Sequence, residues 1–316
     1  MKAVELCAGA GGQALGVEMA GFKHSVLVEI DSDCCRTLSA NRPQWDVREQ
    51  DLRDFSGIDF RDIDLLAGGL PCPPFSIAGK QLGEADERNM FPEGIRLVSE
   101  INPKAVMFEN VRGMLSSSFD EYRTTISDSI EAMGYRTGWR LLNSSDFGVP
   151  QNRSRVVFMA IKRELCESLP WPPPSLSPPP TVAETLKDLL AANGWEGVEE
   201  WCKKAESVAP TIVGGSKKHG GPDLGPTRAK EAWRKLGVNG KSIAELPPEC
   251  DFTGMPRLTV PMVARIQGFP DSWKFEGRKT SAYRQVGNAF PPPVATAVAK
   301  EIAGVLECNR LLLQPA

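Results

Sequence analysis

The sequence predicts an α/β protein with a doubly wound, Rossmann-like, mostly parallel sheet and a second, smaller domain. Three observations lead to this prediction. Short apolar runs alternate with helical patterns, a glycine-rich loop follows the first apolar run, and the composition changes at a stretch rich in proline. Strands separated by helical patterns are typical of βαβ units. The chain has 316 residues, and at about 150 residues per domain it is expected to form about two domains.

The apolar runs of the chain predict strands that are buried on both faces. Several runs are continuously apolar rather than alternating, which suits a parallel sheet covered by helices on both sides. The expected strands span residues 4–6, 25–31, 64–69, 104–110 and 155–161. The expected helices span residues 14–20, 182–192, 229–237 and 294–307.

Residues 170–180 contain seven prolines in eleven positions and predict an extended linker or a domain boundary. Beyond them, residues 203–241 carry nine basic and three acidic side chains, although the whole chain has a net charge of −3. Such a segment can bind phosphates or can be the solvated face of a helix, and its charge alone does not separate the two.

Composition and cysteine usage exclude several classes of protein. The chain is 41% hydrophobic and 24% charged, which is typical of a globular protein rather than a disordered or fibrous one. Its eight cysteines form no C-x-x-C pair and it has two histidines, so we expect no metal site and no disulfide framework. No apolar run is long enough to span a membrane, and no signal peptide opens the chain. We therefore expect a cytoplasmic protein.

The segment after the first strand, CAGAGGQALG, is expected to bind a cofactor that contains a nucleoside. Gly9, Gly11 and Ala14 match the pattern G-x-G-x-x-A, in which glycines let a ligand approach the backbone. Glu29 ends the second strand, where a carboxylate commonly accepts hydrogen bonds from ribose hydroxyls. Asp51 is expected either to accept from an adenine amino group or to cap a helix.

Two further strand ends are predicted to deliver a thiol and a carboxyl group to one crevice. Cys72 follows the third expected strand within GGLPCPPFS, and Glu109 with Asn110 ends the fourth. In open α/β sheets, ligands bind outside the carboxyl ends of the strands. The thiol can be a nucleophile and the carboxyl group a proton donor or base. The alternatives are a buried, unreactive cysteine and a capping carboxylate.

In these residues the chain resembles the DNA (cytosine-5) methyltransferases, which use S-adenosylmethionine (the bacterial restriction-modification type). The resemblance rests on an ordered series of segments rather than on one motif. These segments are ELCAGAGGQALG, VEID, QDLRDF, GGLPCPPFSIAGKQ, FENVRG, PQNRSRVVFMAI, RLTVPMVARIQGFPDSW and YRQVGNAFPPPVA. They imply a discontinuous catalytic domain of residues 1–162 plus 257–316, and a target-recognition domain of residues 163–256.

The resemblance implies methyl transfer to carbon 5 of a cytosine that has been flipped out of double-stranded DNA. Cys72 would add to carbon 6 of the base as the nucleophile. Glu109 would hold or protonate the ring nitrogen at position 3, and Arg155 would contact the carbonyl at position 2. Arg153 would support Arg155 or Glu109. Without the resemblance, we would expect either arginine to form an ordinary salt bridge.

The resemblance also assigns the residues that bind S-adenosylmethionine. The Gly-rich loop would line the methionine end, Glu29 would bind the ribose, Ile30 would pack on the adenine, and Asn288 would reach back to the methionine. The full set is Cys7, Ala8, Gly9, Gly11, Gly12, Glu29, Ile30, Asp51, Leu52, Pro71, Asn288 and Ala289. Cys7 stands where many members have an aromatic residue, and Ala289 replaces a frequent serine.

Contacts to DNA are expected from the segment after Cys72 and from the basic segment. The expected residues are Ser76, Lys80, Gln81, Lys217, Lys218 and Arg228. Phosphate contacts of this kind position a protein on the duplex without reading the sequence. We expect a monomer without a bound metal, and the family implies that a separately encoded restriction endonuclease can accompany such an enzyme.

Three other interpretations stay open at this point. The first is an RNA cytosine-5 methyltransferase of the same family acting on transfer RNA. The second is a nicotinamide-dependent oxidoreductase, which would use the glycine loop and Glu29 but would leave Pro-Cys, Glu-Asn-Val and Gln-Asn-Arg-Ser-Arg without a role. The third is a DNA-binding relative without activity, which the presence of Cys72, Glu109 and Arg155 argues against.

Overall fold

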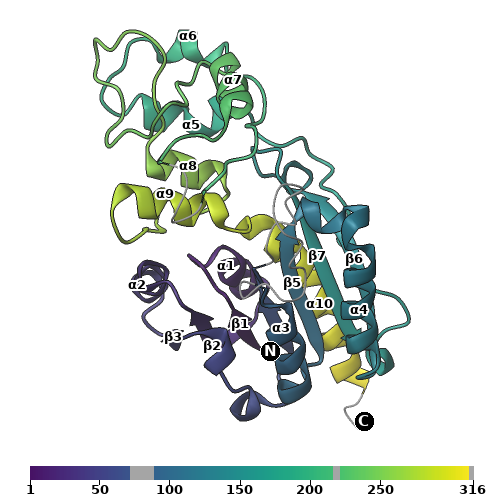
Figure 1. The fold of residues 1–316 in the computed structure, drawn as a ribbon. Coiled ribbons are helices and arrows are strands. Elements are labelled where there is room, and N and C mark those ends of the chain that lie inside the picture. The colour runs from purple at the N-terminus through teal and green to yellow at the C-terminus, as the bar shows by residue number, and fades with distance from the viewer. Residues whose placement is uncertain (72–88, 216–220, 313–316) are drawn as a thin grey trace.

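The computed structural model describes residues 1–71, 89–215 and 221–312. Within them, seven strands form one sheet in the order β3-β2-β1-β4-β5-β7-β6 (Figure 1). The strands are β1 (Lys2–Leu6), β2 (Lys23–Glu29), β3 (Val47–Glu49), β4 (Leu65–Gly68), β5 (Ala105–Val111), β6 (Tyr135–Asn143) and β7 (Ser154–Lys162). All the pairings are parallel except those that β7 makes with β5 and β6. The mostly parallel, doubly wound sheet that the sequence predicts is confirmed.

The five expected strands are present, and β3 and β6 are two strands that the sequence did not predict. Both lie at edges of the sheet, where one side of a strand has no strand partner. β3 has three residues, none of them buried, and β6 mixes buried, half-buried and exposed positions. Neither therefore has the continuous apolar run that marked the central strands.

Helices cover both faces of the sheet. α3 (Phe91–Ile101) and α4 (Asp120–Glu131) pack on one face, with Leu97, Val98 and Ile126 in its core. α1 (Gly12–Met19) and the last helix, α10 (Pro292–Leu312), pack side by side on the other face. Of the remaining helices, α2 (Ser32–Asn41) follows β2.

Segments after the proline-rich stretch form a smaller group of helices at the end of the molecule away from the two termini (Figure 1). These are α5 (Val182–Leu190), α6 (Val198–Cys202) and α7 (Thr227–Lys235), and α8 (Val260–Ile266) and α9 (Lys279–Asn288) lie between them and the sheet. One apolar cluster runs from Leu186 and Trp233 through Met262 to Leu38. The smaller group therefore shares its core with the helices beneath it. Within the described residues, no helix has the length and apolar character needed to cross a membrane.

Candidate active site

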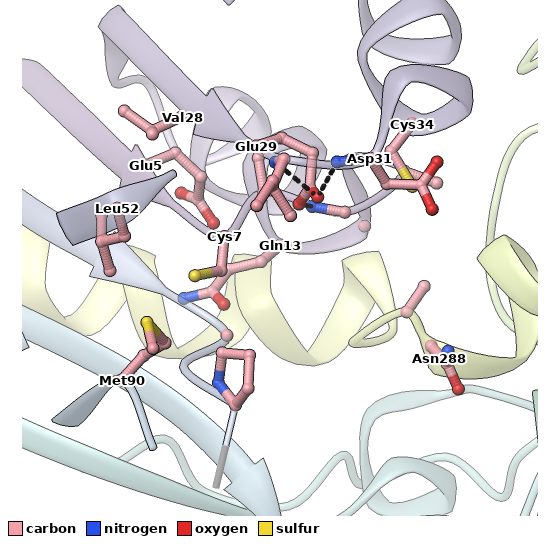
Figure 2. Close-up of a pocket in the computed structure, with 18 of the residues that line it drawn as sticks. Glu5, Cys7, Gln13, Val28, Glu29, Asp31, Cys34, Leu52, Met90 and Asn288 are labelled. Carbon is pink, nitrogen blue, oxygen red and sulfur yellow. Dashed lines mark hydrogen bonds between the residues drawn. The ribbon is translucent and has the colours of Figure 1, made fainter. Parts of the chain in front are cut away.

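A cavity of about 610 Å³ opens outside the carboxyl ends of β1, β2, β4 and β5 (Figure 2). Its wall includes the segments that follow these strands and, from the far end of the chain, α9 and the residues after it. This volume lies within the usual range for small-molecule sites. The position agrees with the general rule for open α/β sheets.

The Gly-rich loop after β1 turns sharply into α1. Its backbone has positive φ angles at Cys7 (49°), Gly9 (53°) and Gly11 (85°). Gly12 is needed for a different reason, because a Cβ there would stand 2.3 Å from the carbonyl oxygen of Phe290. A Cβ on Gly9 would meet no atom within 4 Å, so this part of the loop faces open space. Glycines thus provide both the turn and room beside it.

The Glu29 carboxylate organises this end of the cavity. Its Oε2 accepts a hydrogen bond from the Gly9 N–H (2.7 Å), and its Oε1 accepts from the N–H groups of Ile30 (2.9 Å) and Asp31 (2.8 Å), drawn in Figure 2. Burial raises the pKa of Glu29, whereas these three hydrogen bonds lower it. The Ile30 side chain beside it is 63% exposed on the cavity wall, which leaves an apolar surface open to a ligand.

Asp51 fits both of the interpretations that the sequence left open. Its carboxylate caps the 3-10 helix Leu52–Asp54, accepting from the Arg53 N–H at 3.0 Å, and pairs with the Arg53 guanidinium at 2.6 Å. The same residue lines the cavity, together with Leu52 and Met90. Capping therefore does not remove Asp51 from the cavity.

Glu109 lines the cavity and pairs with Arg155. Arg155 Nε lies 2.8 Å from Glu109 Oε1, and the two residues come from the adjacent strands β5 and β7. Burial raises the pKa of Glu109, and the Arg155 and Arg153 charges oppose this shift. A carboxyl group with a raised pKa keeps its proton closer to neutral pH, which suits a proton donor.

The loop that carries the expected nucleophile leaves β4 beside this pair. Pro71 lines the cavity, and a Cβ on Gly69 would stand 3.5 Å from Glu109 Oε2. The Asn110 side-chain amide donates to the Leu70 carbonyl at 2.9 Å and so ties this loop to β5. Cys72, the next residue after Pro71, lies outside the described residues.

A family model for C-5 cytosine-specific DNA methylases matches residues 1–304. The chain belongs to this family. Over 97% of its length it is 53% identical to the Type II methyltransferase M.NaeI of Lentzea aerocolonigenes, of which it covers 75%. It is also 50% identical to the Type II methyltransferase M.NgoMIV of Neisseria gonorrhoeae, with 96% of this chain and 97% of that protein covered. The DNA interpretation is thereby supported over the RNA alternative.

Solved structures show the same fold at low sequence identity. The Dnmt2 structure of Spodoptera frugiperda superposes with a TM-score of 0.66 at 18% identity, covering 96% of this chain and 99% of that one. Dnmt2 of S. pombe gives a TM-score of 0.64. The family and the fold imply that this DNA methylase uses S-adenosylmethionine.

Arg153 of the methylase lies apart from the cavity wall. Its guanidinium is fully buried and donates to the carbonyls of Ile212 (2.6 Å), Gly287 (2.8 Å) and Ala289 (3.0 Å). These contacts join β7 to the segment that leads toward α7 and to the end of α9. The structure thus brings Arg155 to Glu109 and directs Arg153 to backbone groups, a difference that two arginines two residues apart do not reveal in sequence.

Sequence reasoning missed several residues of the cavity wall. They include Glu5, Gln13, Asp31, Cys34, Gln50, Met90, Arg284, Gln285 and Phe290. Glu5 is the most informative, because both of its carboxylate oxygens are buried without a hydrogen-bond partner in the described part of the chain. The Nε2 atom of His24 lies 3.7 Å from its Oε2. All of them except Cys34 and Met90 lie within the segments that carry the family resemblance, and that position is the signal that could have found them.

The cavity fits a cationic nucleoside cofactor. The Glu5 carboxyl group faces the cavity beside Cys7, as Figure 2 shows, and positive charge in a ligand would stabilise its ionised form, which burial disfavours by raising its pKa. Glu29, open space beside Gly9 and the exposed face of Ile30 suit a ribose and an aromatic base. Within residues 1–71, 89–215 and 221–312, no cluster of three His, Cys, Asp or Glu side chains could hold a metal ion.

Of the six residues expected to contact DNA, Arg228 alone lies among the described residues. Ser76, Lys80, Gln81, Lys217 and Lys218 lie outside the described residues. Arg228 is exposed in the first turn of α7, and among the described residues no ion pair engages it. By contrast, Lys230 and Arg234 on the same helix pair with Asp223 and Glu231.

Proposed function

We propose that this methylase transfers a methyl group from S-adenosylmethionine to carbon 5 of a flipped-out cytosine in a specific double-stranded DNA sequence. The observation that carries the proposal is the pairing, at 2.8 Å, of Arg155 with Glu109, which lines the cavity together with Pro71. It supplies an acid and a cation where the chain continues into Cys72.

The proposed reaction uses Cys72 as a thiolate that forms a bond to carbon 6 of cytosine, which makes carbon 5 nucleophilic. Glu109 gives or shares a proton at ring nitrogen 3, so that the added electron pair is not left as full charge on the ring. Arg155 stabilises charge at the carbonyl at position 2 and holds the Glu109 carboxyl in place. S-adenosylmethionine supplies the electrophilic methyl group. Loss of the carbon-5 proton then lets the bond to Cys72 break.

The cofactor would be held by the cavity residues already described. Asp51, Leu52 and Ile30 would surround the adenine, and Glu29 would accept from the ribose hydroxyls. The methionine end would lie along the Gly-rich loop and against Asn288 and Ala289, with Pro71 near the reacting methyl group. The open face of Ile30 and the three N–H groups that hold Glu29 support this arrangement.

We further propose that residues 1–162 and 257–316 form the catalytic domain and that residues 163–256 form the target-recognition domain. The basic segment of the latter, with Lys217, Lys218 and Arg228, would contact phosphates, as would the loop with Ser76, Lys80 and Gln81. The enzyme would act as a cytoplasmic monomer. The names of the relatives support a cognate endonuclease as a separate partner.

Bisulfite sequencing of DNA from cells that express the chain tests the proposed function directly. Methylated cytosines within one short recurring sequence are expected in the wild type, and none in a Cys72→Ser variant. Methylation that survives the Cys72→Ser change would contradict the nucleophile assignment. Wild-type protein that methylates transfer RNA but not duplex DNA would contradict the substrate.

A further inference from the structure

One arginine side chain on the cavity wall, Arg284, makes only long contacts with its neighbours. We propose that Arg284 binds the carboxylate at the amino-acid end of S-adenosylmethionine and so selects cofactors that carry this group. The inference rests on the proposed cofactor and deepens it.

Arg284 lines the cavity from α9, one helical turn before Asn288. Its side chain is 18% exposed, and its closest acidic atom is Asp31 Oδ2, at 3.7 Å. Its guanidinium donates to Ser281 Oγ at 3.3 Å, which is long for a hydrogen bond to a cation. A guanidinium has five N–H donors, so most of its capacity remains for a ligand.

The second cation on the wall is already neutralised. Arg53 donates to Asp51 from Nε at 3.0 Å and from Nη2 at 2.6 Å, in the two-pronged geometry typical of a strong pair. Among the described residues that line the cavity, Arg284 is therefore the available partner for an anion.

The remaining charges of the wall increase the need for such a partner. Besides Asp51 and Glu109, which are paired with Arg53 and Arg155, the wall carries the carboxyl groups of Glu29 and Asp31. These carboxylates suit the sulfonium and the ammonium of the cofactor, but they disfavour its carboxylate by like-charge repulsion. A ligand that carries both signs is accommodated when its carboxylate lies against the cation.

The orientation of the cofactor brings its amino-acid end to α9. In Figure 2, Leu52 and Met90 lie at one end of the cavity, and Asp31, Cys34 and Asn288 lie at the other. With the adenine beside Leu52 and the methyl group directed toward Pro71 and Glu109, the rest of the methionine extends toward Asn288. Arg284 stands on the same helix at this end, bridging toward Asp31.

A purely structural role for Arg284 is the main alternative, because the pair with Asp31 joins α9 to α2. That junction has stronger contacts of its own. Thr37 Oγ1 of α2 donates to Gln285 Oε1 of α9 at 2.7 Å. Asn41 of α2 also bonds the main chain of Lys274, in the segment before α9, with both ends of its amide, at 2.6 and 2.9 Å. A pair at 3.7 Å adds little to this set.

Calorimetric titration of wild type and Arg284→Gln with two ligands separates the two roles. The ligands are S-adenosylmethionine and its decarboxylated form, which keeps the adenosine, the sulfonium and the amine. We expect the wild type to bind S-adenosylmethionine more tightly, and the variant to lose about 10- to 100-fold for it, as for a hydrogen-bonded charge. The variant is expected to lose less than about threefold for the decarboxylated form. Arg284→Lys should restore part of the preference.

Arg278→Gln is the matched control, because Arg278 is exposed at the start of α9 and does not line the cavity. It should bind both ligands as the wild type does. An equal loss for both ligands in Arg284→Gln, or a wild type that does not distinguish them, would overturn the inference and leave the proposed function standing. A wild type that binds neither ligand would overturn both.

Discussion

The side-chain amide of Asn110 donates a hydrogen bond of 2.9 Å to the carbonyl of Leu70, two residues before Cys72. Its own carbonyl oxygen accepts from the Val111 N–H at 2.8 Å, so both ends of the buried amide are engaged. Asn110 follows Glu109 directly. One strand end thus presents the proposed acid and anchors the loop of the proposed nucleophile.

Asn110→Ala is therefore expected to lower kcat about tenfold or more, with little change in the Kd for S-adenosylmethionine. The loop would lose its anchor and the Leu70 carbonyl would be left buried without a partner. Steady-state methylation and calorimetry would measure the two effects. Asn143→Ala, at the end of the edge strand β6, is the control and should retain activity. A variant at Asn110 with wild-type kcat would contradict the positioning role.

Glu109→Gln is expected to reduce kcat by about 10²- to 10⁴-fold, the usual contribution of a general acid or base. Burial raises the pKa of the wild-type carboxyl, and its protonated form is the proposed proton donor. The wild-type rate should accordingly fall as the pH rises through that raised pKa. The residual rate of Glu109→Gln should not fall over the same pH range. A wild-type rate that rises steadily with pH would indicate that the ionised form is the active one.

Two helical glycines are expected to respond in opposite directions to substitution by alanine. A Cβ on Gly16 of α1 would stand 2.6 Å from the carbonyl oxygen of Pro292, whereas a Cβ on Gly304 of α10 would meet no atom within 4 Å. Gly16→Ala should lower the free energy of unfolding by about 1–3 kcal/mol. Gly304→Ala should raise it by up to about 1 kcal/mol. Denaturant unfolding measures both, and equal effects would contradict the close packing of α1 on α10.

Arg228 offers a test of the proposed phosphate contacts. The slope of log K for DNA binding against log salt concentration is negative. In Arg228→Gln it should become less negative by about one, uniformly across DNA sequences. Arg234→Gln is the control on the same helix, since Arg234 already pairs with Glu231 at 2.7 Å. An unchanged slope for Arg228→Gln would remove Arg228 from the DNA surface.

Three buried or partly buried cysteines of the first two βα units, Cys7, Cys34 and Cys35, should be poor nucleophiles. Burial, and then the charge of Glu29, raise the pKa of the Cys7 and Cys34 thiols, and raise that of Cys35 to about 12. Alkylation requires the thiolate, so iodoacetamide near pH 8 should label the exposed Cys250 and Cys308 before Cys7, Cys34 and Cys35. Peptide mass spectrometry follows each site over time. Labelling of Cys7 as fast as that of Cys250 would contradict the burial of its thiol.

Much of the catalytic fold could be predicted from local patterns. The continuous apolar runs of β1, β2, β4, β5 and β7 mark strands buried on both faces, and positive φ angles at Gly9 and Gly11 explain the glycines of the loop. The edge strands β3 and β6 were not predicted, because half-exposed strands carry no such run. The antiparallel direction of β7 also has no local signal, since an apolar run reads the same in either direction.

By itself, the sequence determined the order of strands and helices, the family, and the residue types offered at each strand end, because these depend on neighbours along the chain. The tertiary structure decided which distant side chains meet. It brought Arg155 to Glu109 across a strand pair, and it directed Arg153 to the backbone of residues 59 to 136 positions away. It also placed Arg284 opposite Asp31. Such contacts follow from how helices pack on the sheet, and packing is set by the whole core rather than by any local segment.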